Sequence, residues 1–266
     1  MTIPELALDM AIGLAFIAGA MTIALGTYLL THRVASRFEH EKTKDLAGSI
    51  TFRVAGLHAL IVALIFAQEL LSYQELRKGF LQEATAVADI FFDLDRYQVE
   101  DADPIRLVVA KYVETVITED WRALAENRRV SSIGYTHFET IYNYILDLEP
   151  ESGRQEALRD HMLTSVHALT TYRQARTAAA QDGISLLFWL AAIAGLILVC
   201  APYFVFPPTA LHLSLVAIFS IYMGLVLFII YSLSDPFSPP GAIQPAAFVQ
   251  LLDGEIGRWL QGPPGN

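Results

Sequence analysis

Three polar side chains interrupt a strongly apolar stretch of the chain, and they are the residues best placed to do chemistry. Spacings of three, four and seven residues put them on one face of a helix, together with two isoleucines. Polar groups are costly in hydrocarbon, so this face is expected to line a water-filled path rather than meet lipid. The candidate pore-lining residues are His58, Ile61, Ile65, Gln68 and Glu69.

Each kind of residue on this face has a separate expected role. Ile61 and Ile65 would form an apolar constriction, and Glu69 would form a charged ring near one mouth of the pore. In the alternative interpretation, Gln68 and Glu69 already lie at the membrane surface and His58 bonds a neighbouring helix. The sequence leaves both interpretations open.

Outside this face the sequence holds no arrangement typical of an enzyme. It contains no phosphate-binding or dinucleotide-binding glycine motif, no HExxH pair and no nucleophile elbow. The seven histidines are scattered, and the single cysteine, Cys200, lies in an apolar stretch where a buried thiol is the simplest expectation. We therefore expect no catalytic residue, no metal site and no cofactor. The acids of the central region are expected on solvated helix faces.

Four apolar windows determine the elements that position the polar face. The chain is 54% hydrophobic with a mean hydropathy of +0.41, and a membrane span needs about 20 mostly apolar residues. The first window lacks a basic leader, so we expect a retained span rather than a signal peptide. The windows are Leu6–Leu30, Val54–Leu71, Ile184–Phe206 and Thr209–Leu233. They predict an all-α, multi-pass protein of the cell (inner) membrane with four transmembrane helices and an inserted helical soluble domain.

The charged residues concentrate between the second and third windows, which predicts a water-facing domain there. We expect transmembrane helices 1 and 2 in residues 1–72, the helical domain in 73–183, transmembrane helices 3 and 4 in 184–234, and a C-terminal tail in 235–266. The second span should continue as one helix to about Tyr97. Three further helices are expected from apolar spacing, over 105–117 and 138–145 and from a capping pattern at Ser152. An amphipathic piece should follow at Phe248–Leu260.

A stripe of small residues runs along the first span at spacings of three or four. Small side chains let a second helix backbone approach closely, which is how helices associate within lipid. We therefore predict a helix-packing face there. Its members are Ala11, Ala15, Gly19, Thr22 and Gly26.

Short motifs in a fixed order along the chain resemble the bacterial bestrophin-like family of membrane proteins. They lie within about residues 10–250, and each is weak by itself. The order is Asp45-x-x-Gly48, Glu83-Ala84, Tyr112-x-x-x-Val116-x-x-Glu119-Asp120-Trp121, Arg173-x-x-Arg176, Gly183-Ile184, Trp189, Asp235-Pro236-Phe237 and Pro245-x-x-Phe248. Trp121 and Asp235-Pro236-Phe237 are the signature residues that we carry forward. Ser185 and Pro239 depart from the family's usual proline and glycine, which affects turn geometry more than chemistry.

The resemblance implies a pentameric ion channel whose central pore is lined by the second span. Most bestrophins conduct anions and some bacterial relatives pass cations, and an acid at Glu69 favours cations. The implied partners are the lipid bilayer, further copies of the chain and inorganic ions. No nucleic acid is expected, because the net charge is −10 and no basic footprint is present.

Two questions stay open from the sequence alone. The first question is orientation in the membrane. The bases of the connector Thr31–Arg53 slightly outnumber those flanking the other ends of the spans, which favours an external helical domain. The resemblance implies a cytoplasmic helical domain, and we follow the resemblance. The second question is function. The alternative to an ion channel is a non-conducting membrane scaffold or sensor whose helical domain binds a partner.

Overall fold

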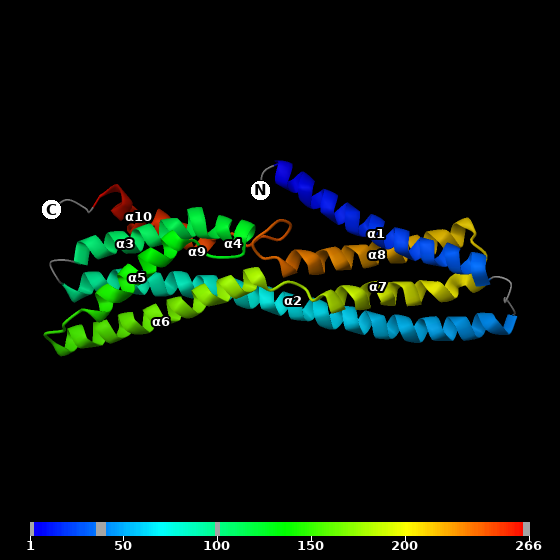
Figure 1. The fold of residues 1–266 in the computed structure, drawn as a ribbon, viewed down its shortest axis with the longest axis horizontal. Coiled ribbons are helices and arrows are strands. Elements are labelled where there is room, and N and C mark those ends of the chain that lie inside the picture. Colours follow the sequence, from blue (N-terminus) through cyan, green and yellow to red (C-terminus); the bar gives the residue numbers. More distant parts are fainter. Residues whose placement is uncertain (1–2, 36–40, 99–101, 263–266) are drawn as a thin grey trace. The chain divides into compact units, whose positions relative to one another are not determined.

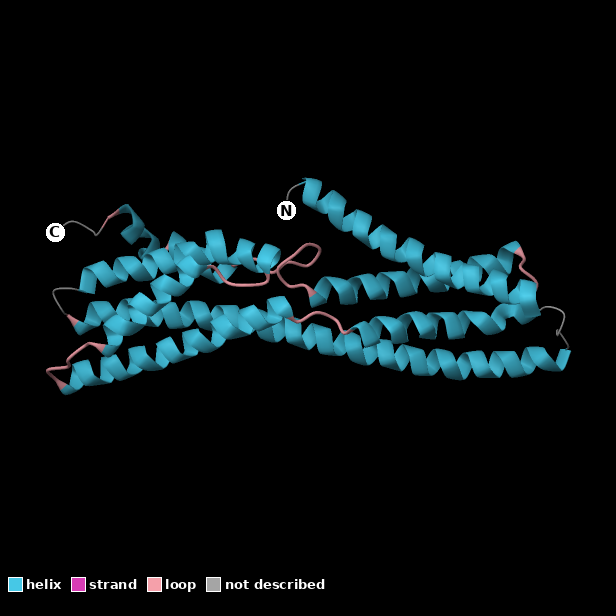
Figure 2. Cartoon of the chain, in the orientation of Figure 1, coloured by secondary structure: helices cyan, strands magenta, loops and turns pink. Residues whose placement is uncertain are grey.

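The computed structural model describes residues 3–35, 41–98 and 102–262, and every regular element in these ranges is a helix (Figures 1 and 2). Four of the helices are long and apolar enough to cross a membrane. The predicted fold class, an all-α polytopic membrane protein with an inserted helical domain, is therefore confirmed.

The helices form two compact units that share one helix. The first, which we call the membrane unit, contains Met1–Ser72, Gly183–Asp235 and Pro239–Gly241. The second, the soluble unit, contains Tyr73–Asp182, Pro236–Ser238 and Ala242–Asn266. Helix α2 (Glu41–Tyr97) runs unbroken through Ser72, which confirms the prediction of one long helix ending near Tyr97.

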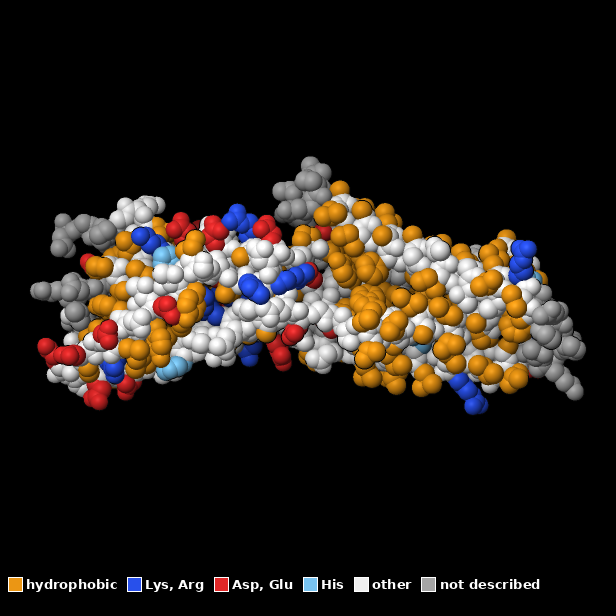
Figure 3. Space-filling model, viewed as in Figure 1, with side chains coloured by type: hydrophobic (Ala, Val, Ile, Leu, Met, Phe, Trp, Pro, Cys, Tyr) orange, Lys and Arg blue, Asp and Glu red, His pale blue; other side chains and the backbone are white. Residues whose placement is uncertain are grey.

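The membrane unit consists of four apolar helical segments. They are α1 (Ile3–Ala35), the first part of α2, α7 (Leu186–Cys200) continued by the 3₁₀ turn η3 (Ala201–Val205), and α8 (Ala210–Ser234). Hydrophobic side chains cover the outward surface of these helices in Figure 3. Such a surface is stable only against lipid tails or other apolar protein surfaces.

The backbones of helices α1 and α8 approach each other closely in the membrane unit. Ala20, Ala24 and Tyr28 of α1 are buried in the core of this unit. At Gly224 of α8, a Cβ atom would lie 2.6 Å from Cα of Ile17, so only glycine fits there. The contact follows the small-residue logic of membrane helices.

The turn between α7 and α8 is tied to the end of α1 by two hydrogen bonds. The Tyr28 hydroxyl donates to the Phe206 carbonyl at 3.1 Å, and the His32 ring lies 2.8 Å from the Phe204 carbonyl. Pro207-Pro208 follows this turn, and the Thr209 hydroxyl caps α8 by accepting from the His212 backbone amide.

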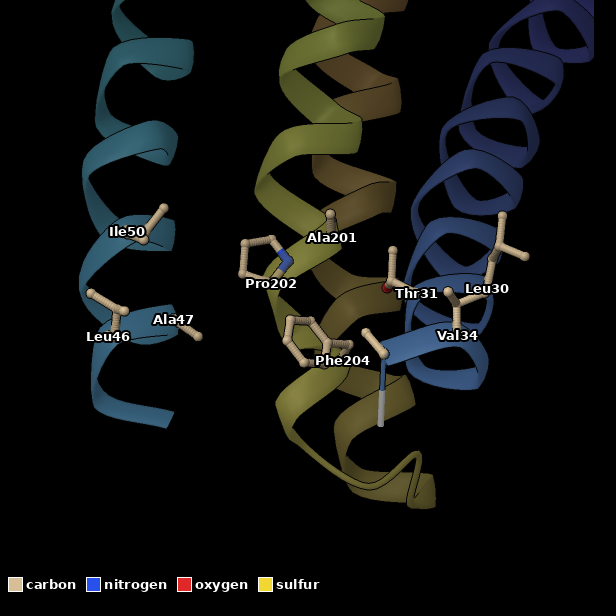
Figure 4. A pocket seen from close by; sticks show the side chains of 10 residues that line it. Leu30, Thr31, Val34, Leu46, Ala47, Ile50, Ala201, Pro202 and Phe204 are labelled. Atoms are coloured by element: carbon tan, nitrogen blue, oxygen red, sulfur yellow. The ribbon is translucent and has the colours of Figure 1, made fainter. Parts of the chain in front are cut away.

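An apolar pocket of about 610 Å³ lies beside η3, between the end of α1 and the start of α2 (Figure 4). Leu46 and Ile50 of α2 are separated there from Val34 of α1 by Pro202 and Phe204. The first turns of α2 therefore stand clear of α1 within one chain.

The soluble unit is built from short helices around the second part of α2. They are α3 (Ala102–Thr115), the π-helical turn η2 (Val116–Asp120), α4 (Trp121–Asn127), α5 (Ser132–Leu146), α6 (Gly153–Gln181), α9 (Ala246–Asp253), α10 (Glu255–Arg258) and the 3₁₀ turn η4 (Trp259–Gln261). Their apolar faces share one core in which Phe91, Tyr112, Ile141, Met162 and Phe248 are fully or almost fully buried.

Three of these elements match predicted helices, and three details differ. The three helices expected after α2 correspond to α3, α5 and α6, and the Ser152 hydroxyl accepts from the Gln155 amide at 3.3 Å as a helix cap. The piece predicted as Phe248–Leu260 is broken at Gly254. The connector Thr31–Arg53 is helical at both ends, and its residues 36–40, like 263–266 of the tail, lie outside the described residues. Neither η2 nor α4 was predicted.

Candidate functional site

The five predicted pore-lining residues lie along one arc of the α2 surface. One edge of this arc is exposed, and the other edge is buried against the same chain. Gln68 is exposed and Ile61 is 43% exposed, whereas Ile65 and Glu69 are half-buried. His58 is only 4% exposed. Part of this arc thus belongs to the packing of one chain, and part is left uncovered by it.

His58 packs against α7 of its own chain. A Cβ atom at Gly195 would collide with the imidazole, so glycine makes the space that the ring fills. The Nε2 atom is buried and has no hydrogen-bond partner among the described residues. The ring therefore sits behind the exposed part of the arc.

The exposed edge of the arc combines polar and large apolar side chains. Gln68 donates weakly to the Ser72 hydroxyl at 3.4 Å, one turn further along α2. Leu64 and Leu71, on either side of Gln68 along the helix, are 63% and 56% exposed. An exposed glutamine between such leucines needs water or another protein surface beside it, because hydrocarbon cannot satisfy its amide.

The small-residue stripe of α1 lies on the side that faces away from its own bundle. Ala11, Ala15, Gly19 and Gly26 are exposed, and a Cβ atom added at either glycine would meet nothing within 4 Å. Packing of α1 within the chain uses its opposite side, where Ala20 and Ala24 are buried. The stripe stays a prediction of contact with another helix, which must come from outside this chain.

A cluster of five buried polar side chains forms the second candidate site, inside the soluble unit. The Tyr112 hydroxyl of α3 donates to Glu83 of α2 at 2.9 Å. Arg176 of α6 bridges the two acids, with its Nη2 atom 3.0 Å from Glu83 and 3.3 Å from Asp120 of η2. Arg173 donates to the Tyr112 hydroxyl at 3.2 Å. Four separate elements thus meet in one network.

The cluster is electrically balanced and sealed from water. Glu83, Tyr112, Asp120 and Arg176 have no exposed surface, and Arg173 is 6% exposed. Two carboxylates and two guanidinium groups cancel, which is the condition under which charges can be buried. Burial, with the neighbouring Glu83 charge, raises the pKa of Tyr112, so its hydroxyl stays protonated as a donor.

Some hydrogen-bonding capacity in the cluster is unused. Within the described residues, Oε2 of Glu83 and the Nε and Nη1 atoms of Arg176 have no partner. The Arg176 guanidinium instead lies 5.7 Å from the Trp121 ring and 6.0 Å from the Phe248 ring. These cation–π contacts offset part of its desolvation.

The π-helical turn η2 is what brings Asp120 into the cluster. A π turn inserts one extra residue and rotates the following side chains, and such turns are often found at functional sites. The Asp120 carboxylate also accepts from the Ser131 backbone amide at 2.8 Å. A Cβ atom at Gly134 would lie 3.0 Å from it, so α5 starts directly against this acid.

The signature residues Trp121, Pro236 and Phe237 pack beside the cluster. The Trp121 indole donates to the Ile243 carbonyl at 2.7 Å, and its ring lies 5.8 Å from the Phe237 ring. Pro236 and Phe237 are buried, and Asp235 is half-buried at the end of α8. The C-terminal region is thereby anchored in the core of the soluble unit.

One sequence prediction is wrong at specific positions. Acids of the helical region were expected on solvated faces, but Glu83, Asp93 and Asp120 are buried. Glu83 lies three residues after Phe80 and four before Val87, both buried, so it occupies a core position of α2. This apolar spacing around an acid was the signal that sequence reasoning missed.

The chemistry available at these two sites is electrostatic. Within the described ranges no group of three or more His, Cys, Asp or Glu side chains could hold a metal ion. The α2 arc offers an amide, a carboxylate and apolar side chains on an uncovered surface, and the soluble cluster offers a fixed set of paired charges.

Four apolar helices, the second of which continues into a helical unit inserted before the third, define a polytopic membrane protein. The Bestrophin-like domain model matches residues 18–248, and the chain therefore belongs to the bestrophin-like family. This confirms the resemblance drawn from the sequence motifs.

Solved structures share the fold across nearly the whole chain. A crystal structure of a bacterial bestrophin homologue from Klebsiella pneumoniae is 12% identical with a TM-score of 0.67, covering 94% of this chain and 99% of that one. A point variant of a Klebsiella pneumoniae bestrophin homologue is 13% identical with a TM-score of 0.65, over 94% and 99% of the two chains. No curated protein sequence matches the chain.

Proposed function

We propose that this protein is a homo-oligomeric ion channel of the bacterial inner membrane, a pentamer in which α2 of each subunit lines a central pore. Membership of the bestrophin-like family supports a channel-type function. The pore assignment rests on α2 itself, because its arc carries polar side chains through a membrane span.

The exposed amide of Gln68 is the observation that carries the proposal. Its own chain leaves it uncovered among exposed leucines, although it lies in a transmembrane stretch. A ring of sister subunits around a water-filled axis would hydrate Gln68 and cover the leucines at the same time. The exposed small-residue stripe of α1 supplies a second surface for contacts between subunits.

The arrangement of the arc suggests separate functions along the pore. Ile61 would form the narrow apolar ring, and Glu69, one turn beyond Ile65, would present negative charge that favours cations. His58 supports the wall from behind through its contact with Gly195. Gln68 would provide the neutral polar contact between the constriction and the mouth.

The test is conductance of the purified full-length protein in planar bilayers. Single-channel currents are expected, and Glu69→Gln should shift the permeability ratio toward anions because a ring of negative charge is lost. Ile61→Thr should raise the conductance by wetting the constriction. Ala59→Thr is the matched control, because Ala59 is also exposed but the helical period places it on the opposite side of α2.

Two results would refute the proposal. One is silence of the wild-type protein across a range of pH and calcium concentrations. The other is an oligomer whose centre is solidly packed or filled by lipid, which would favour a non-conducting scaffold or sensor instead. Equal effects of Ile61→Thr and Ala59→Thr would remove Ile61 from the pore wall.

A further inference from the structure

A pocket of about 640 Å³ lies in the soluble unit, where α2 has just left its apolar stretch. One wall is formed by α2 through Gln74, Arg77 and Lys78. The other is formed by the segment that leads into α9, including Gln244, and by α9 itself, including Gln250. The volume falls in the range of roughly 300–1,000 Å³ that is typical of small-molecule sites.

The lining of this pocket is positively charged in a protein that carries a net charge of −10. Arg77 and Lys78 both line it, and no acid does. Both bases are exposed, and neither forms an ion pair or hydrogen bond with any part of the chain that the structure describes. Cations left without a partner beside three amide side chains form a donor-rich site suited to an anion.

Phosphate is the anion whose chemistry fits this set of donors. A guanidinium and an ammonium group both form charge-assisted hydrogen bonds to phosphate oxygens, and amide N–H groups add neutral ones. Leu81 and Ala247 line the same pocket, so an apolar part of the ligand would also find contacts.

Position along α2 favours a phospholipid over a free phosphate as the source. Arg77 follows Leu71, the end of the predicted span, by six residues, which is about 9 Å along a helix. The headgroup layer extends roughly 5–8 Å beyond the hydrocarbon on each side. The long side chains of Arg77 and Lys78 can span the few ångströms between their Cα atoms and the headgroup layer, as basic side chains do at membrane interfaces.

We propose that this pocket binds the phosphate headgroup of an anionic phospholipid, with Arg77 and Lys78 as its anion-binding residues. Gln244 and Gln250 would orient the headgroup by hydrogen bonds. The lining residues all belong to the soluble unit and none belongs to the proposed pore, so the proposal stands whether or not the protein conducts ions.

The experiment measures lipid binding to the delipidated full-length protein in detergent by native mass spectrometry. The probes are phosphatidylglycerol and phosphatidylcholine of the same acyl length. The wild-type protein should prefer phosphatidylglycerol, and the double variant Arg77→Gln/Lys78→Gln should bind it roughly thirtyfold more weakly, about fivefold per base near an anionic surface. Lys111→Gln/Arg129→Gln is the matched control, since it removes two exposed bases of the same unit outside the pocket.

The control variant should bind phosphatidylglycerol within about twofold of the wild type. Equal loss in both double variants, or unchanged binding in the pocket variant, would overturn the proposal. Inorganic phosphate is tested separately by thermal shift. If phosphate binds through Arg77 and Lys78 while the two lipids bind equally, the ligand is a soluble phosphate and the lipid assignment is wrong.

Discussion

Replacing Arg176 by methionine should strongly destabilise the soluble unit. Its Nη2 atom contacts two carboxylates, Glu83 at 3.0 Å and Asp120 at 3.3 Å, and all three side chains are buried. The Asp120 contact is also a hydrogen bond, and one to a charged group contributes about 1.5–3 kcal/mol. Breaking a buried ion pair by removing one partner costs about 3–5 kcal/mol in measured cases. We therefore expect a loss of about 3–5 kcal/mol in the free energy of unfolding.

The assay is native-state hydrogen exchange of the full-length protein in detergent, read on the amides of α3 and α6. Exchange through global opening of the unit should become faster by a factor corresponding to about 3–5 kcal/mol. Arg122→Met is the matched control. Its bond to Glu119 is shorter, at 2.6 Å, but the two side chains are 62% and 40% exposed, so about 0.2–1 kcal/mol is expected.

A double substitution distinguishes burial of charge from loss of packing. Removing Arg176 leaves the cluster with two acids and one base, so one buried negative charge has no counterpart. Adding Glu83→Gln restores neutrality and should recover part of the lost stability instead of adding to the loss. Additive losses, or a loss from Arg176→Met no larger than that from Arg122→Met, would refute the electrostatic reasoning.

Three further predictions concern close packing, and thermal unfolding of the detergent-solubilised protein tests each. Gly195→Ala should lower the melting temperature because the new methyl group collides with the His58 ring. Adding His58→Ala in the same chain should restore most of the lost melting temperature. Failure of this rescue would argue against the contact between Gly195 and His58. Gly224→Ala should cost about 1–3 kcal/mol because it presses on the backbone of α1, whereas Gly26→Ala, in open space, should change little; equal effects would contradict the observed packing. Trp121→Phe should cost about 1–3 kcal/mol, because loss of the indole N–H leaves the buried Ile243 carbonyl without its hydrogen bond. An unchanged melting temperature would count against a stabilising role for this bond.

The helices were predictable because their signals are local. Long apolar windows identify the spans, and the absence of proline or glycine from Leu57 to Lys78 predicts that α2 continues past the membrane. The cap at Ser152 is likewise specified by residues within one turn.

The π turn η2 and the buried cluster were not predictable in the same way. No sequence pattern around Asp120 predicts that the helix contains one extra residue in this turn. The base that pairs with Asp120 at the end of that turn is Arg176, more than fifty residues later in the chain. Arg173 and Arg176 were counted among the bases flanking a span, and only their spacing from Leu169 and Ala180 indicates a buried face.

The buried cluster of the soluble unit and the exposed arc of α2 differ in how far their side chains depend on one another. Glu83, Tyr112, Asp120, Arg173 and Arg176 form a buried network in which two acids balance two bases and the Tyr112 hydroxyl joins them by hydrogen bonds. Such a network specifies a fold, since losing one member leaves a buried charge that no local adjustment can satisfy.

The α2 arc follows a different rule. Ile61, Gln68 and Glu69 have no ion-pair partner within the described chain, so their side chains can change without leaving a buried charge unpaired. Family membership therefore accounts for the architecture, and in the proposed channel these few α2 side chains would select the conducted ion. A family member with the same cluster but a base in place of Glu69 should keep the fold and favour anions.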